Sequence, residues 1–184
     1  QITPRLITAT LKKNADGSFI FSKTYDGNTT VAQALDSNYT LSNVVQGEEQ
    51  NIKINHGEDV TGVYNDDAAT GAAAKNAGQN KSITFTGIAL TGTGSSNYTI
   101  ADSLSGNVGE IKQKALTATL SNYIYSRVYD GTTTVKESLS SANLDTTAIV
   151  GSDKVYIATN NNGKYNDKNV ATGHLVTFSD VTLE

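Results

Sequence analysis

A tandem duplication within the 184 residues constrains the fold of this chain more than any other feature. Residues 1–11 return in altered form as residues 110–120, and short triplets follow in the same order in both copies. The duplication predicts two domains of one fold, at residues 1–109 and 110–184. The matched triplets are Tyr25-Asp26-Gly27 with Tyr129-Asp130-Gly131, Tyr64-Asn65-Asp66 with Tyr165-Asn166-Asp167, and Ile83-Thr84-Phe85 with Val176-Thr177-Phe178.

The two copies differ in length, because the separation between matched residues shrinks along the chain. The first copy therefore carries extra residues, at 12–19, 56–59 and 67–74. Since insertions are tolerated in surface loops, we expect these segments at loop tips. No part of the second copy matches residues 89–100, so we expect its closing strand to be missing or to come from residues beyond Glu184.

Residue usage and turn signals favour an all-β fold. Thr, Asn, Asp and Gly are all heavily used, and Thr suits strands while Asn, Asp and Gly suit turns. Short alternating apolar segments are separated by turn dipeptides such as Asp16-Gly17 and Asn162-Gly163. This pattern predicts two small β-sandwiches of the immunoglobulin-like kind. Residues 31–35 and 135–144, after the Tyr-Asp-Gly triplets, could instead carry a short helix, and a helix packed across a sheet would make the fold β-grasp-like.

The residues that the chain lacks narrow its function. It has no Cys, Met or Trp and two His, which rules out disulfides and cysteine nucleophiles and leaves few groups for acid–base catalysis. A net charge of −4 provides no attraction to nucleic acid or anionic lipid. No apolar run approaches the roughly 20 residues of a membrane span. We therefore expect a monomeric binding or structural module, not an enzyme, with no cofactor, no nucleic-acid partner and no membrane insertion.

The Tyr-Asp-Gly triplets are predicted to be structural turns. Glycine accepts a positive φ, and the aspartate carboxylate can accept a hydrogen bond from the N–H two residues on. Each tyrosine would then bury its ring beside the turn. A calcium site is the alternative, but calcium loops need several spaced oxygen ligands, and the sequence has no such run. The residues of these turns are Tyr25, Asp26, Gly27, Tyr129, Asp130 and Gly131.

Candidate ligand contacts lie on or near the loops that distinguish the first copy. A tyrosine there offers an apolar face with a hydrogen-bonding tip, which suits carbohydrate and protein surfaces. Acidic doublets such as Glu48-Glu49 point to opposite faces of a strand, so they do not form a catalytic carboxylate pair by themselves. We assign no catalytic, cofactor-binding or metal-binding residue. The candidate contacts are Tyr39, His56, Asp59, Asp67 and Thr70.

Several longer segments resemble a known family. Residues 23–30 read KTYDGNTT, residues 127–134 read RVYDGTTT, and residues 165–173 read YNDKNVATG. These segments resemble the YDG repeat of large bacterial surface adhesins, including filamentous-haemagglutinin-type exoproteins. The first copy departs from the family pattern at Gly47-Glu48, where Gly-Asp is expected, and at residues 67–74, which split the Y-x-D-K-N segment.

The resemblance implies an extracellular protein on the bacterial cell surface, and it implies no reaction. Many such repeats would form a stalk that projects a distal adhesive region, with neighbouring repeats of the chain as partners. The alternative is an adhesive module that recognises a glycan or a host extracellular-matrix protein through the loops of the first copy.

Overall fold

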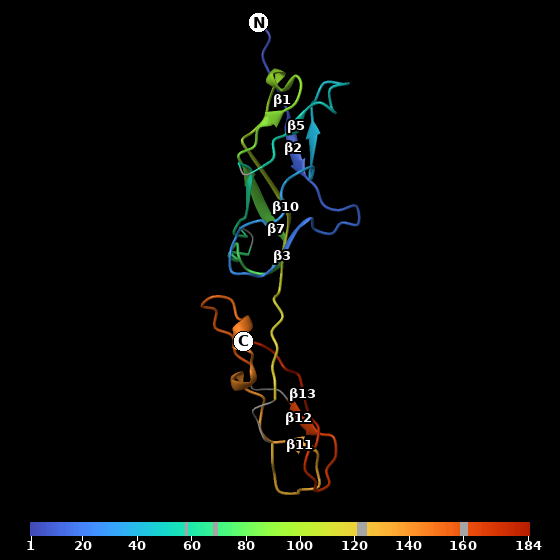
Figure 1. Ribbon diagram of the computed structural model, residues 1–184, viewed down its shortest axis with the longest axis vertical. Helices are drawn as coiled ribbons and strands as arrows, with labels where there is room; N and C mark the ends of the chain where they lie inside the picture. The colour runs from blue at the N-terminus through green and yellow to red at the C-terminus, as the bar shows by residue number, and fades with distance from the viewer. Residues whose placement is uncertain (58, 68–69, 121–124, 159–161) are drawn as a thin grey trace. The chain divides into compact units, whose positions relative to one another are not determined.

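The computed structural model covers residues 1–184 and describes all of them except 58, 68–69, 121–124 and 159–161 (Figure 1). The chain divides into two compact units, unit 1 at Gln1–Lys114 and unit 2 at Ala115–Glu184. The boundary predicted after residue 109 falls inside β10 (Ser103–Lys112), the last strand of unit 1. This strand pairs with unit 1 as far as Lys112, so the structural boundary comes later than the repeated sequence.

Unit 1 is built on a four-stranded sheet with the order β3-β10-β7-β6. Three of these strands, β3, β10 and β7, are labelled in Figure 1. Within the sheet, β10 runs parallel to β3 on one side and antiparallel to β7 on the other. The other three strands are β3 (Phe21–Thr24), β6 (Thr61–Tyr64) and β7 (Gly78–Thr86). The two-stranded ladders are β1 (Arg5–Leu6) with β9 (Tyr98–Thr99), β2 (Thr8–Leu11) with β4 (Tyr39–Ser42), and β5 (Lys53–Ile54) with β8 (Leu90–Thr91), and the 3-10 turn η1 (Ser95–Asn97) precedes β9.

Unit 2 has one three-stranded antiparallel sheet, in the order β11-β12-β13. Its strands are β11 (Thr134–Val135), β12 (Asn162–Tyr165) and β13 (Val176–Ser179). Two 3-10 turns, η2 (Ser141–Asn143) and η3 (Thr146–Ala148), lie between β11 and β12 along the chain.

The two units pair their strands in one register. β6 and β7 of unit 1 align with each other as β12 and β13 of unit 2 do, residue for residue. The duplication seen in the sequence is therefore a duplication of strand pairing. The corresponding pairs are Thr61↔Thr86 and Asn162↔Ser179, Gly62↔Phe85 and Gly163↔Phe178, Val63↔Thr84 and Lys164↔Thr177, and Tyr64↔Ile83 and Tyr165↔Val176.

A glycine faces a phenylalanine at the same place in both registers. A Cβ built on Gly62 would lie 2.6 Å from the Phe85 ring, and one on Gly163 would lie 2.7 Å from the Phe178 ring. Carbon atoms do not approach this closely, so each glycine leaves the space that the ring across the strand fills.

Both units have apolar interiors of different size. The interior of unit 1 packs side chains of the β2–β4 ladder against the four-stranded sheet, with Phe21 and Ile83 fully buried. The buried cluster of unit 2 is smaller and lies outside its sheet. It consists of Leu139, Leu144 and Ile157, with partly buried apolar neighbours that include Phe178.

The all-β prediction is confirmed, and the short helix considered after each triplet is absent. Residues 31–35 are irregular, and residues 135–144 contain the end of β11 and the single turn η2. Val31 and Leu35 are both buried from an irregular segment, so their burial needs no helix. The described residues contain no α-helix that could cross a sheet, as a β-grasp fold requires, or that could span a membrane.

The extra segments of the first copy fall between strands. Residues 12–19 lie between β2 and β3, residues 56–59 between β5 and β6, and residues 67–74 between β6 and β7. Of these, residues 58 and 68–69 lie outside the described part of the chain.

Candidate functional site

The Tyr-Asp-Gly triplet of unit 1 forms a tight turn after β3. Gly27 has a φ of 79°, a left-handed conformation that favours glycine. The Asp26 carboxylate accepts a hydrogen bond from the Asn28 N–H at 3.1 Å, and the Asn28 side chain accepts one from the Thr30 N–H at 2.9 Å. Two successive side chains therefore satisfy the backbone of the turn.

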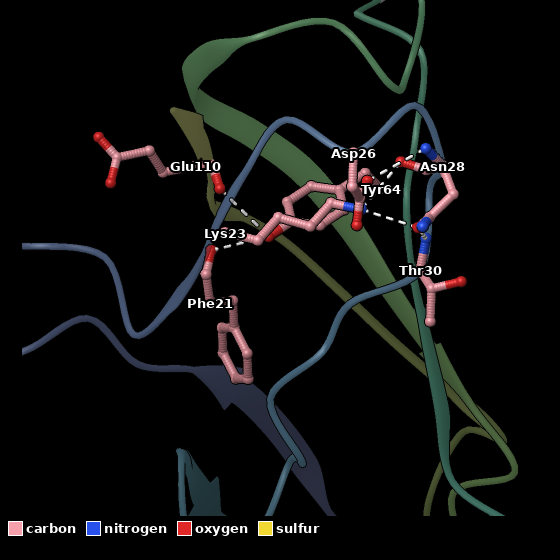
Figure 2. A network of polar contacts seen from close by, with 7 residues as sticks. All are labelled: Phe21, Lys23, Asp26, Asn28, Thr30, Tyr64 and Glu110. Carbon is pink, nitrogen blue, oxygen red and sulfur yellow. Dashed lines mark hydrogen bonds and ion pairs between the residues drawn. The ribbon is translucent and has the colours of Figure 1, made fainter. Parts of the chain in front are cut away.

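Lys23 joins this turn to the sheet. Its side chain is only 7% exposed, and its ammonium lies 2.7 Å from Asp26 Oδ1. The same nitrogen donates to the Asn28 carbonyl at 2.9 Å and to the Asn28 side-chain oxygen at 2.8 Å. Since an ammonium has three protons, these three acceptors satisfy it completely. Figure 2 shows the lysine extending along the Tyr64 ring, whose centroid is 5.4 Å from the ammonium.

Tyr64 forms the floor of the network. It is 2% exposed, and its hydroxyl lies 3.1 Å from the Phe21 carbonyl of β3 and 3.2 Å from the Glu110 carbonyl of β10 (Figure 2). Burial, together with the negative charges of Asp26 and Glu110, raises the pKa of Tyr64 to about 12. The phenol is therefore a neutral hydrogen-bond donor that ties three strands together.

Unit 2 repeats the network with Arg127 in place of Lys23. The guanidinium lies 2.6 Å from Asp130 Oδ1 and 5.2 Å from the centre of the Tyr165 ring. It also donates to the hydroxyl and the carbonyl of Thr132, the residue that corresponds to Asn28. Asp130 in turn accepts from the Thr132 N–H at 3.0 Å, and Gly131 has a φ of 77°.

Both turn carboxylates have a pKa below the ordinary value. For Asp26, burial alone would raise the pKa, and it is outweighed by hydrogen bonds from Lys23 and Asn28 and by the lysine charge. For Asp130, the lowered pKa comes first from the Thr132 N–H and then from the Thr132 hydroxyl, with the charge of Arg127 adding to it. Ionised carboxylates of this kind act as structural acceptors and are poor proton donors at neutral pH.

The tyrosines of the triplets differ between the units. Tyr25 is half-buried and packs against the core of unit 1. Tyr129 is 56% exposed, so the expected burial of its ring does not occur. The rings that lie under the turns are those of Tyr64 and Tyr165, which come from the next matched triplet.

The same arrangement of basic residue, Asp-Gly turn and buried tyrosine thus occurs once in each unit, and the strands around it pair in the same register. The family model of the YDG domain matches residues 10–106 and 112–184, which is nearly the whole chain. The chain belongs to the YDG domain family. No curated protein and no solved structure matches it. The two matched segments of the YDG domain correspond to units 1 and 2.

The ligand contacts predicted from the sequence lie in two places in the first YDG domain. Tyr39 and His56 line one hollow of about 520 Å³, together with residues that include Glu49 and Lys53. The Tyr39 hydroxyl already accepts a hydrogen bond from the Ile54 N–H at 2.8 Å, which gives this tyrosine a structural role.

Asp59, Asp67 and Thr70 do not line that hollow. Asp67 accepts from the hydroxyl of Thr70 at 2.7 Å and from its N–H at 3.2 Å, so these two residues fold their own loop. Asp59 is exposed, and its backbone carbonyl lies against Gly87. The structure therefore brings together two of the five candidate residues at a hollow and two others within a loop.

The departure at Gly47-Glu48 has a structural consequence. The Tyr98 hydroxyl donates to Glu48 Oε2 at 2.5 Å and accepts from the Val45 N–H at 3.2 Å. The hydrogen bond to Glu48 raises the pKa of Tyr98. Glu48 thus anchors a buried tyrosine.

Within the described part of the chain, no three His, Cys, Asp or Glu side chains gather closely enough to hold a metal ion. The part of the network that sequence reasoning missed is the basic residue over the buried tyrosine. Lys23 and Arg127 precede their Tyr-Asp-Gly triplets by the same spacing, and that coincidence was the available signal.

Proposed function

We propose that the two YDG domains are non-catalytic structural repeats of a bacterial cell-surface adhesin, where they serve as a stalk that projects a distal adhesive region. The observation that carries the proposal is the network around Lys23, in which the ammonium, the carboxylate and the backbone donors all satisfy one another. A site built to act on a ligand keeps polar groups directed outward, whereas this one uses them to hold a turn against a sheet.

Repetition supports the same proposal. Unit 2 rebuilds the network with a different basic residue and a different partner, Arg127 and Thr132, and keeps the strand register. The two units therefore share the turn network and the strand register. The absence of Cys and Met would also make such a stalk insensitive to thiol and thioether oxidation outside the cell.

A binding screen tests the proposal. The 184-residue chain is applied to a glycan array and to immobilised extracellular-matrix proteins, beside a His56→Ala variant and a variant that lacks residues 67–74. A structural repeat predicts no saturable binding by any of the three proteins. Thermal unfolding of each variant serves as the control that it is folded.

An adhesive module is the second candidate, and the hollow that holds Tyr39 and His56 favours it. This candidate predicts saturable binding to a glycan or a matrix protein that the His56→Ala variant loses. Saturable binding that both variants retain would also overturn the stalk, and would direct the search to another surface.

A further inference from the structure

In unit 1, β10 fills the space between β3 and β7. It lies antiparallel to β7, with Leu104 opposite Phe85, and parallel to β3, with Ile111 opposite Lys23. Leu104 and Ile111 are both buried in the core. β10 therefore closes the sheet with backbone pairing on both of its sides.

Unit 2 has the two flanking segments, but β13 is the edge strand of its sheet. β13 corresponds to the end of β7, and residues 125–128 correspond to β3. The contact that joins these flanks in unit 1, Phe21 against Phe85 at 5.1 Å, is present in unit 2 as Tyr125 against Phe178 at 5.3 Å. The ring contact between the two flanking segments is therefore present in unit 2, although the described residues of unit 2 contain no strand in the position of β10.

A hollow of about 570 Å³ marks the place of the missing strand. Several of its lining residues correspond to residues beside β10 in unit 1, where Gly109 lies against Tyr64, Ile83 and Lys81 and Gly106 pairs with Ile83. Leu175, one of the lining residues, is 67% exposed. The lining includes Tyr125, Arg127, Tyr165, His174, Leu175 and Val176.

A buried hydroxyl in this hollow points to the missing backbone. Tyr165 is 9% exposed, and its hydroxyl has no hydrogen-bond partner within the described part of the chain. The corresponding hydroxyl of Tyr64 is within hydrogen-bond distance of the Glu110 carbonyl, which belongs to β10. An inserted strand would provide Tyr165 with the same kind of acceptor, and buried polar groups are almost always paired in this way.

We propose that unit 2 binds an extended peptide strand of the β10 type, inserted antiparallel to β13 and parallel to residues 125–128. The strand carries apolar residues at the positions of Leu104 and Ile111 and a glycine where it passes Tyr165. The glycine is required because a Cβ on Gly109 of unit 1 would lie 2.8 Å from the Tyr64 ring and 2.7 Å from Ile83. Insertion of a strand at an open sheet edge is an established mode of peptide recognition.

The occupant is a separate peptide segment with the chemistry of residues 103–112, and it is not β10 of a second copy. β10 of a second copy is already paired on both sides within its own unit 1, so it is not free to enter the slot. This inference does not depend on the stalk function, because an adhesive module would have the same open edge.

The probe is a synthetic peptide with the sequence of residues 103–112, SLSGNVGEIK, titrated into the 184-residue chain by calorimetry. We expect saturable binding at one site. A peptide with Gly109→Val is the matched control, and its side chain should abolish binding. No binding of the native peptide, or equal binding of the two peptides, would overturn the proposal.

Two protein variants locate the site. Tyr165→Phe removes the hydroxyl that is proposed to donate to the inserted strand, so we expect the peptide to bind about two- to tenfold more weakly. Tyr64→Phe changes the matching residue of unit 1 and should leave the affinity for the peptide unchanged.

Two outcomes point to another source of the strand. Loss of peptide binding on Tyr64→Phe alone would mean that the peptide displaces β10 of unit 1. Concentration-dependent dimerisation of the chain without peptide would mean that a second copy supplies the strand. Either result would contradict the proposal.

Discussion

At the scale of single residues, Lys23 is the side chain on which the turn of unit 1 depends. Its ammonium is almost fully removed from water and is compensated by one carboxylate and two oxygens of Asn28. A buried charge of this kind stabilises the fold only while its partners remain, because removal of one member leaves the others desolvated and unpaired.

We predict that Lys23→Met lowers the free energy of unfolding of unit 1 by about 1–3 kcal/mol, the usual range for lost hydrogen bonds to a charged group. The methionine keeps the apolar stem over Tyr64 and removes only the charge. Chemical denaturation of the full chain measures the change.

Lys112→Met is the matched control. The Lys112 side chain is 62% exposed and its ammonium lies 3.8 Å from Glu110, so this substitution should change stability by less than about 0.5 kcal/mol. Equal effects of the two substitutions would mean that the burial of Lys23 has no energetic consequence.

The raised pKa of the Tyr64 phenol determines how the free energy of unfolding should change at alkaline pH. Since burial, together with the negative charges of Asp26 and Glu110, raises this pKa from 10.0 to about 12, the folded state favours the neutral form. The resulting stabilisation is complete below pH 10 and is lost as the pH rises from 10 to about 12. Denaturation at a series of pH values should show this loss, and Tyr64→Phe should lack it. A variant that loses stability over the same pH range as the natural chain would show that Tyr64 is not its source.

At the scale of elements, the pairing of β6 with β7 and of β12 with β13 rests on a glycine opposite an aromatic ring. Gly62 and Gly163 are not in left-handed conformations, so these positions require glycine because a Cβ atom would collide with the facing ring. Each allows the ring of Phe85 or Phe178 to lie across the neighbouring strand.

Gly62→Ala and Gly163→Ala should each destabilise their own unit by about 1–3 kcal/mol, the cost typical of overpacking. Gly78→Ala is the control, because Gly78 lies in β7 and a Cβ there meets nothing within 4 Å. Thermal unfolding distinguishes the three variants. An unchanged midpoint for Gly62→Ala would contradict the packing described for Phe85.

The strand pairing was more predictable from the sequence than the site was. Matched triplets at Tyr64 and Tyr165 already implied that the surrounding strands repeat. Residues 31–35 were open to a helical interpretation because Val31 and Leu35 are apolar and four positions apart. An irregular loop that buries two side chains gives the same spacing as one face of a helix. The contact of Lys23 with Tyr64 joins segments that are far apart in the chain, so the shared spacing of Lys23 and Arg127 marked the basic residue but not the tyrosine that it contacts.

At the scale of the whole molecule, the two units share a strand register but differ in their sheets and in the size of their cores. Unit 1 closes its sheet with β10 and has a large core, whereas unit 2 has a three-stranded sheet, a small core and a hollow of about 570 Å³. A smaller buried apolar area implies lower stability, so we expect unit 2 to unfold first.

Mechanical extension of single molecules, held by their two ends, tests most directly the claim that these are two structural repeats. At about 3.5 Å per residue, the 114 residues of unit 1 and the 70 of unit 2 correspond to released lengths of up to about 400 Å and about 250 Å. We predict two separate steps near these lengths, the shorter at lower force, with Lys23→Met weakening only the longer. A single step, or a smooth extension with no steps, would contradict the account.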